Sequence, residues 1–173
     1  CSALKPVIKR VGPCLLAFNP DSFRVLASSI ISQQISTKAA TSIRNKVIAL
    51  LGGRLQPGRF AKVTDDQLRA CGLSGGKVKF LRDLVAKVTD GTVPIRHLPA
   101  MPDDDIRERL LEVSGIGPWT VDMFLMFGLG RPDVLPTGDL GIRVDQLTSF
   151  GEDGRGELYA ASREGTIYQF VAG

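Results

Sequence analysis

A turn of two glycines around one isoleucine, Gly115-Ile116-Gly117, separates two apolar-periodic runs in this 173-residue chain. Apolar side chains recur at helical spacing on both sides of it, at Ile106, Leu110 and Val113 before it and at Val121, Phe124, Leu125 and Leu129 after it. Pro118 stands where the first turn of a helix accepts proline. The pattern predicts a helix, a tight hairpin and a second helix. Ile116 should lie between the helices, and the glycines permit positive φ and close backbone approach.

Two interpretations of this hairpin are open. The backbone amides around Gly115, Gly117 and Trp119 are expected at a helix N-terminus without intrahelical partners, which is where an anion binds readily. The same Gly-x-Gly pattern also occurs in plain corners between helices that bind nothing. The hairpin by itself favours neither interpretation.

Composition favours a polyanionic partner mildly and argues against several other classes. The net charge is +4 at pH 7, and no apolar run approaches the roughly 18 residues of a membrane span. Cys1, Cys14 and Cys71 lack C-x-x-C spacing and His97 is the only histidine, so neither a zinc site nor an iron–sulfur cluster is indicated. No cofactor is expected, and a reducing cytoplasm fits this cysteine usage. Because the chain opens on Cys1, a truncated start is favoured over a lipid-modified cysteine.

The residues before the hairpin predict further helices with clear start and stop signals. Residues 22–35 place their apolar side chains on one helical face. Ser36 or Thr37 can cap the next helix, which ends at Gly52-Gly53. Thr64-Asp65-Asp66-Gln67 has the spacing of a capping box and opens a short helix.

Another helix is predicted to start at Ser74, which can cap it. Lys77, Lys79 and Arg82 should fall on its exposed side, where they could touch phosphates or simply form a solvated basic face. The polar pair Gln33-Gln34 lies at the junction of two earlier helices, where an ordinary polar corner is the plainer interpretation.

Beyond the hairpin, Asp139 precedes a run that suggests the start of a helix. An aspartate there can cap the helix, and this role is compatible with catalysis because a helix N-terminus keeps the carboxylate ionised. From about residue 146 the character changes. Residues 151–156 are rich in turn formers, and 157–162 with 166–170 predict a β-hairpin. We therefore expect a domain over 1–145 and an atypical β-like tail over 146–173.

Four motifs in a fixed order now give a family resemblance. They are Ile31-Ser32-Gln33-Gln34-Ile35-Ser36 with Lys38-Ala39-Ala40, then Gly72-Leu73-Ser74 with Lys77, then Val113-Ser114-Gly115-Ile116-Gly117-Pro118-Trp119-Thr120, and last Leu135-Pro136-Thr137-Gly138-Asp139 with Arg143. The chain resembles the helix-hairpin-helix DNA glycosylase superfamily, in its 3-methyladenine DNA glycosylase branch. This resemblance implies an all-α fold of two helical lobes, with a DNA-binding cleft and the hairpin beside it.

The resemblance also implies DNA-binding roles for the hairpin. The amides at Gly115 and Gly117, together with Ile116, Trp119 and Thr120, are expected to hold a phosphate near the lesion. A monovalent cation at the hairpin carbonyls near Gly115 and Gly117 often assists in this family. Such contacts position the protein without reading sequence, and they weaken with salt.

The corner at Gln33 and Gln34, with Ser36, matches the place where this branch pushes a side chain into the emptied base stack. Extruding a nucleotide costs a few kcal/mol and least for a damaged base. Gln34 is the candidate wedge.

Asp139 matches the catalytic aspartate of the family. Cleaving an N-glycosidic bond builds positive charge on the sugar, and a carboxylate can stabilise that charge and orient or deprotonate the attacking water. Members that also cut the strand place a nucleophilic lysine at the position of Trp119. With tryptophan there, no lyase reaction is expected. Trp119 and Met123 are expected to line a base pocket, where an electron-rich ring favours a cationic purine; core packing is the alternative for Trp119.

The resemblance implies a monofunctional glycosylase that excises alkylated purines from double-stranded DNA with a flipped base. It would act as a monomer in a bacterial cytoplasm, near the nucleoid, or in a eukaryotic nucleus. The family normally continues with further helices after Arg143, and here the β-like tail stands in their place. An inactive DNA-binding remnant is therefore the alternative. A sugar dehydrogenase would rest on the tail alone, which resembles the last hairpin of a β-propeller but has no propeller repeats.

Overall fold

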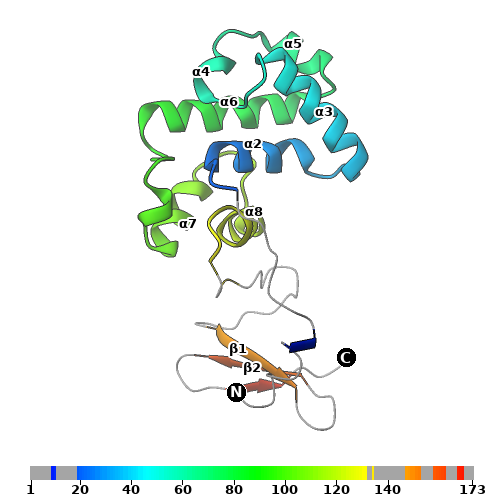
Figure 1. Cartoon of the computed structure of the whole chain (residues 1–173). Helices are drawn as coiled ribbons and strands as arrows, with labels where there is room; N and C mark the ends of the chain where they lie inside the picture. The colour runs from blue at the N-terminus through cyan, green and yellow to red at the C-terminus, as the bar shows by residue number, and fades with distance from the viewer. Residues whose placement is uncertain are drawn as a thin grey trace.

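A computed structural model describes residues 9–10, 19–131, 134, 147–152, 158–162 and 167–169. Residues 19–131 form a helical body that contains no strand (Figure 1). Its elements are α2 (Ser22–Ser32), α3 (Thr37–Leu50), α4 (Pro57–Phe60), α5 (Asp65–Ala70), α6 (Gly75–Asp90), the 3-10 turn η1 (Leu98–Ala100), α7 (Asp103–Leu111), α8 (Pro118–Met123) and the π-helical turn η2 (Phe124–Gly128). The expected all-α fold is confirmed for this part of the chain. No helix in the described ranges is long and apolar enough to cross a bilayer.

Helices begin where the sequence places capping side chains. The Ser36 hydroxyl accepts a hydrogen bond from the backbone of α3, and the Ser74 hydroxyl does the same for α6. Thr64 and Gln67 form a complete capping box at the start of α5. Such caps satisfy amides that the helix itself leaves unpaired, each worth about 1 kcal/mol. At the other end of α6, Gly91 has a φ of +89° and ends the helix in the left-handed region.

Helix α2 is the centre of the core. It packs against α3, α6 and η2, and in Figure 1 it lies between α6 above and α8 below. Its apolar side chains Leu26, Ile30 and Ile31 are fully buried, and Phe23 meets Phe60 edge to face with ring centroids 6.0 Å apart. Burying each such side chain is worth about 1.5–3 kcal/mol. The side of α2 that remains carries serines, and this side lines the cleft described below.

The prediction that Lys77, Lys79 and Arg82 share an exposed face is wrong for two of the three. The Lys77 ammonium donates to the carbonyl oxygen of Ile31 at 2.7 Å and so caps the end of α2. Partial burial lowers the pKa of Lys77. Arg82 connects α6 to three acceptors, the carbonyl oxygens of Phe60 and Val63 and the carboxylate of Asp65. These two side chains hold the helices together, and Lys79 alone is exposed.

The tail contains three antiparallel strands in the order β1-β2-β3: β1 (Leu147–Glu152), β2 (Leu158–Ser162) and β3 (Ile167–Gln169). The predicted hairpin corresponds to β2 and β3. These strands are antiparallel, with Tyr159 opposite Gln169 and Ala161 opposite Ile167. β1 is an additional strand, and it extends into the stretch that the sequence predicts as turns. The boundary between domain and tail at residues 145 and 146 stays a prediction.

Candidate functional site

The hairpin between α7 and α8 has the predicted form. Ile116 is 5% exposed and lies between the helices, as its apolar side chain requires. Gly115 has a φ of +81°, and a Cβ built there would lie 2.3 Å from the ring of Phe80. Gly117 differs, because its φ is −103° and a Cβ would meet nothing within 4 Å. The fold therefore requires glycine at 115, whereas position 117 is open toward whatever binds there.

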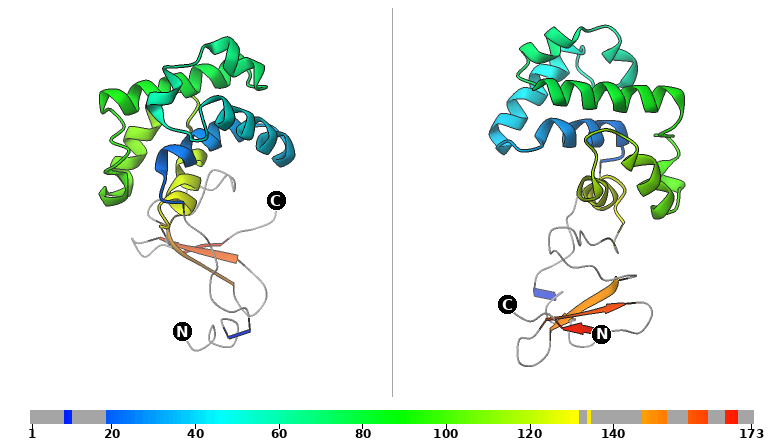
Figure 2. Two further views of the ribbon diagram at one scale, coloured as in Figure 1. Left: turned by 45° about the horizontal axis from the view of Figure 1, so that its top comes forward. Right: turned by 180° about the vertical axis from the view of Figure 1, so that it is seen from behind.

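Helix α6 lies beside the hairpin (Figure 2) and contacts it through side chains. The Asp83 carboxylate accepts a hydrogen bond from the Ser114 backbone N–H at 2.7 Å and lies 3.1 Å from the Lys87 ammonium. Lys87 also donates to the carbonyl oxygen of Glu112. Desolvation raises the pKa of Asp83, but the hydrogen bonds from Ser114 and Lys87 outweigh it, so that the pKa of the carboxyl lies below its usual value.

Asp83→Asn should lower the free energy of unfolding near neutral pH and make it less dependent on pH at acidic pH. Because the folded pKa of Asp83 is lowered, its contribution is complete above the ordinary value of 3.8 and disappears as the pH falls through the lowered value. We expect the variant to be about 1–2 kcal/mol less stable at pH 7, since it loses a charged hydrogen-bond acceptor. The gap to wild type should narrow as the pH falls below 3.8. Urea unfolding at several pH values measures this, with the exposed Asp66→Asn as control; parallel curves for variant and wild type contradict the assignment.

The corner after α2 is fastened to the hairpin. The Gln33 side-chain amide donates to the carbonyl oxygen of Gly115 at 2.7 Å, although 82 positions separate the two residues. Gln34 follows with a φ of +55°, a left-handed conformation that is uncommon outside glycine. The chain has left the helix one residue earlier, at Gln33 with a ψ of 133°, so α2 ends at Ser32 and not at the predicted residue 35. Ile35, at the tip of the corner, is 37% exposed.

The family resemblance implies a monovalent cation at the hairpin carbonyls near Gly115 and Gly117. The Gly115 oxygen accepts the Gln33 amide, and the Gly117 oxygen accepts the backbone N–H of Val121 at 3.1 Å. A carbonyl oxygen has two lone pairs, so each of these oxygens keeps acceptor capacity beside its hydrogen bond. The cation stays a prediction, and no chemical step depends on it.

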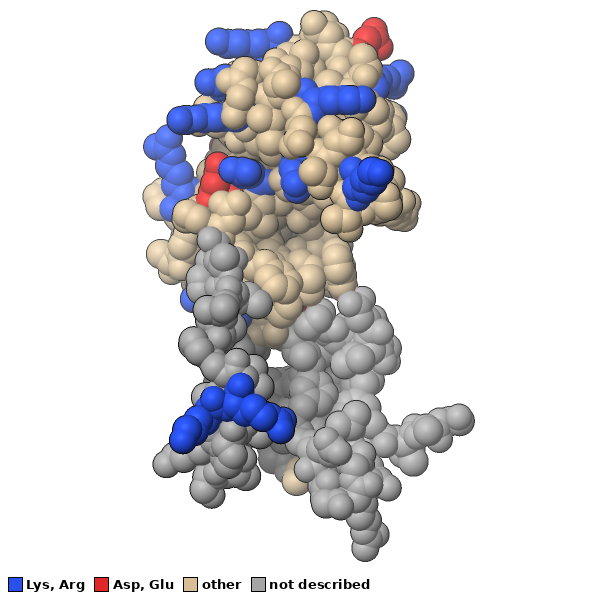
Figure 3. Space-filling view, turned by 45° about the vertical axis from the view of Figure 1, so that its right-hand side comes forward, with Lys and Arg blue, Asp and Glu red and all other residues tan. Residues whose placement is uncertain are grey.

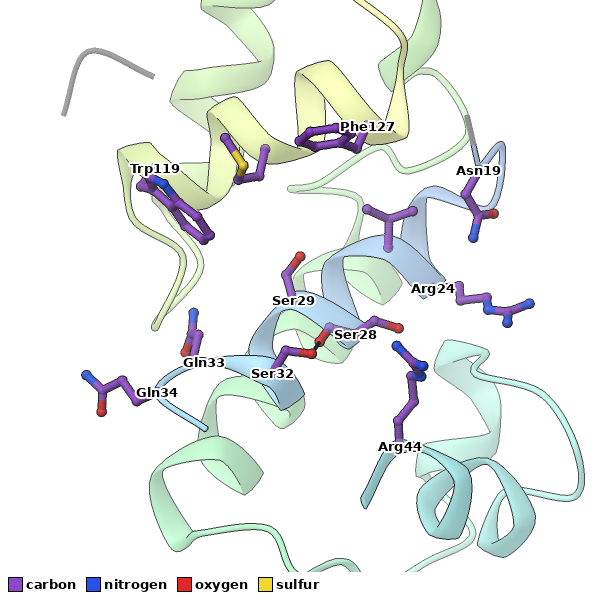
Figure 4. A pocket seen from close by; sticks show the side chains of 12 residues that line it. Asn19, Arg24, Ser28, Ser29, Ser32, Gln33, Gln34, Arg44, Trp119 and Phe127 are labelled. Carbon is purple, nitrogen blue, oxygen red and sulfur yellow. Dashed lines mark hydrogen bonds between the residues drawn. The ribbon is translucent and has the colours of Figure 1, made fainter. Parts of the chain in front are cut away.

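A cleft of about 710 Å³ opens beside the corner and the hairpin (Figure 4). Trp119 and Met123 of α8 line it together with Gln33 and Gln34, so four of the predicted site residues share one surface. Trp119 is 47% exposed. This exposure argues against the alternative of core packing, and an aromatic face in a cleft can stack on a planar ring.

Other predicted residues contribute differently or lie elsewhere. The side chains of Ile116 and Thr120 are both 5% exposed, so any contact with DNA from these positions is limited to the backbone. Ser36 is exposed and caps α3. Asp139 lies outside the described residues, and its catalytic role stays a prediction.

The cleft also contains residues that motif-based analysis missed. Helix α2 contributes Arg24, Ser28, Ser29 and Ser32, α3 contributes Arg44, and Asn19, Val25 and Phe127 complete the lining. The sequence did contain one indication of a basic surface here, because residues 22–63 contain seven basic side chains and no Asp or Glu. On the face of the molecule shown in Figure 3, basic side chains outnumber acidic ones.

The sequence profile of the HhH-GPD superfamily of base excision DNA repair proteins matches residues 27–144. The chain belongs to this superfamily. The match begins within α2 and runs through the hairpin to beyond Asp139, so it includes every residue that the sequence assigned to the site.

Several relatives within the HhH-GPD superfamily are similar to this chain. DNA-3-methyladenine glycosylase 1 of Schizosaccharomyces pombe is 33% identical over 80% of this chain and 64% of its own length. DNA-3-methyladenine glycosylase of Saccharomyces cerevisiae is 40% identical over 70% of this chain and 44% of its own length. The chain thus spans about half to two thirds of the length of these relatives.

Solved structures agree with the HhH-GPD fold. DNA-3-methyladenine glycosidase from Bacillus halodurans has a TM-score of 0.74 and 38% identity, covering 81% of this chain and 65% of that protein. The 3-methyladenine DNA glycosylase of Schizosaccharomyces pombe, solved in complex with abasic DNA, has a TM-score of 0.67 and 32% identity, covering 80% of this chain and 70% of that one.

Gly117→Ala tests whether the HhH-GPD hairpin binds a phosphate through its backbone. The methyl group meets nothing in the protein and φ is ordinary, so we expect stability within about 0.5 kcal/mol of wild type. Binding to duplex DNA should weaken at least about tenfold, because Cβ would stand between a phosphate and the amides. Fluorescence anisotropy measures the affinity. Unchanged affinity in the folded variant would show that no ligand approaches this position closely.

Proposed function

We propose that this chain carries the catalytic cleft of a monofunctional DNA glycosylase that hydrolyses the N-glycosidic bond of alkylated purines, such as 3-methyladenine, and leaves an abasic site. One observation carries the proposal: Trp119 and Met123 share a cleft with Gln33 and Gln34, and Gln33 is bonded to the hairpin. Membership of the HhH-GPD superfamily supports the same chemistry.

Each part of the site has a step in this proposal. The hairpin amides at Gly115 and Gly117 hold a backbone phosphate, which fixes the protein on the duplex without reading sequence. The corner at Gln34 and Ile35 enters the base stack and holds open the gap left by the extruded nucleotide. The extruded base stacks on Trp119, whose electron-rich face favours a positively charged purine.

Hydrolysis follows from the charge that develops on the sugar. An alkylated purine already carries positive charge and leaves readily, so little acid catalysis is needed. Asp139 is proposed to stabilise the cationic sugar and to orient or deprotonate the attacking water. Because position 119 holds tryptophan and has no amine, no Schiff base forms and the strand stays intact.

The proposal also covers the setting of the reaction. The partner is double-stranded DNA with one flipped base, bound by a single copy of the chain. Residues 1–145 are proposed to form the glycosylase domain. The compartment would be the one that holds the DNA, a bacterial cytoplasm or a eukaryotic nucleus.

Base release from a defined duplex tests the proposal. The chain is incubated with a duplex containing 3-methyladenine and with an undamaged duplex of the same sequence. We expect free base from the first alone, together with a strand that breaks at the lesion only after alkali treatment. Salt-sensitive binding without base release would contradict the proposed activity and would establish an inactive DNA-binding remnant. Strand cleavage without alkali would contradict the monofunctional mechanism.

A further inference from the structure

Two arginines line the cleft on the side of α2 and α3. Arg24 lies near the start of α2, at the opposite end of that helix from the corner with Gln33. Arg44 comes from α3 and points toward α2, where Ser28 and Ser32 lie (Figure 4). Arg44 is half-buried and Arg24 is exposed. Neither residue belongs to the hairpin, the corner or the aromatic wall at Trp119.

Neither guanidinium has a hydrogen bond or an ion pair with any residue in the described part of the chain. Four other arginines of the helical body bind carbonyl oxygens or a carboxylate: Arg59, Arg82, Arg107 and Arg131. Arg54, Arg69 and Arg96 also lack such partners among the described residues, but they lie outside the cleft. A guanidinium carries five N–H donors in a planar fork. Within the described part of the chain, the N–H donors of Arg24 and Arg44 are therefore available to a ligand.

The surroundings of these arginines fit an anion. Ser28, Ser29 and Ser32 line the cleft between them and the corner, and the Ser32 hydroxyl donates to the Ser28 carbonyl oxygen at 2.8 Å. No carboxylate lines the cleft among the described residues. Two positive charges at this end disfavour a cationic base, so an alkylated purine belongs at the Trp119 end and a negative group belongs here.

We propose that Arg24 and Arg44 form a second phosphate site, in which each guanidinium binds one backbone phosphodiester of the same DNA that the hairpin holds. This inference rests on the proposed function for the identity of the ligand. Gln33 follows Arg24 by nine positions, which is about 13 Å along the axis of α2. Phosphates of one strand advance about 3.4 Å per nucleotide along the duplex axis. Arg24 and the corner at Gln33, which is hydrogen-bonded to the hairpin, are thus separated by the length of about four nucleotides of one strand.

The salt dependence of DNA binding tests the proposal. The cleft variant carries both Arg24→Gln and Arg44→Gln. The control variant carries Arg54→Gln and Arg96→Gln, which remove the same charge from two exposed arginines outside this cleft. The probe is a duplex with a stable abasic-site analogue, titrated by fluorescence anisotropy between about 50 and 300 mM KCl. Each lost phosphate contact lowers the slope of log K against log salt by about 0.9. Relative to wild type, we expect the magnitude of this slope to fall by about 2 in the cleft variant and by less than about 1 in the control.

The outcomes separate this inference from the proposed function. Equal slopes for the two double variants overturn the phosphate site, because net charge alone would then explain the effect. A cleft variant with wild-type slope but slower base release also overturns it, and would place the arginines at the base. If wild type releases no base while the cleft variant still loses about 2 from the slope, the second phosphate site stands and the glycosylase proposal fails. Thermal unfolding of both variants confirms that they are folded.

Discussion

Asp139→Asn is expected to slow base release about 100-fold or more while leaving the affinity for an abasic-site duplex within about twofold. Removing a preorganised charge that faces a developing opposite charge costs on the order of 3 kcal/mol of transition-state stabilisation, and a hundredfold corresponds to about 2.7 kcal/mol. Asparagine keeps the shape of the side chain and its capping ability, so the helix start that the sequence predicts there should survive. Single-turnover release of 3-methyladenine measures the rate.

The matched control is Asp104→Asn, which removes the same charge from an exposed position in the first turn of α7. This variant should release base at the wild-type rate. If both variants slow release equally, the effect comes from net charge and Asp139 has no catalytic role. If Asp139→Asn retains full activity, another group must stabilise the sugar cation.

Gly115→Ala is expected to destabilise the fold by about 2–4 kcal/mol. Alanine in the left-handed region costs about 1–2 kcal/mol, and the added methyl overlaps the ring of Phe80, which overpacks a site that is already filled. The variant should also lose DNA affinity, because the Gly115 carbonyl that holds Gln33 would move with the turn. Urea unfolding measures the stability.

Substitutions at two other glycines distinguish the two causes of the lost stability, which are the left-handed backbone and the overlap with Phe80. Gly53 also has a positive φ, of +94°, but a Cβ there meets nothing within 4 Å, so Gly53→Ala should cost only the backbone share of about 1 kcal/mol. Gly117→Ala should cost almost nothing in stability. If Gly115→Ala costs no more than Gly53→Ala, the ring of Phe80 imposes no penalty and does not restrict position 115 to glycine.

Local signals in the sequence predicted most of the helical framework. The caps at Ser36, Thr64 and Ser74 act within one turn of their own residue, so three or four letters suffice to recognise them. The hairpin around Ile116 is equally local, since two glycines and the flanking apolar periodicity define it.

Contacts between distant segments could not be predicted in the same way. Gln33 and Gly115 meet because α2 packs against α6 and η2, and no pattern around either residue encodes that packing. Lys77 and Arg82 have long side chains that serve equally well on a solvated face or across a helix interface, so their periodicity left the choice open. Arg24 and Arg44 belong to different helices. Only the absence of acidic residues between 22 and 63 hinted that they share a surface.

The hydrogen bond between Gln33 and Gly115 fixes the distance between two points that would touch the duplex. The corner cannot advance into the base stack while the hairpin stays behind, because the 2.7 Å contact joins them and α6 supports the hairpin through Asp83. If the corner enters the base stack while the hairpin holds a phosphate, as proposed, we expect the nucleic acid to bend so that it reaches both points at once. Bending energy depends on the local stiffness of DNA. We expect sites that already bend easily to be bound first, so a damaged base in a pliable stretch would be found sooner than the same base in a stiff one.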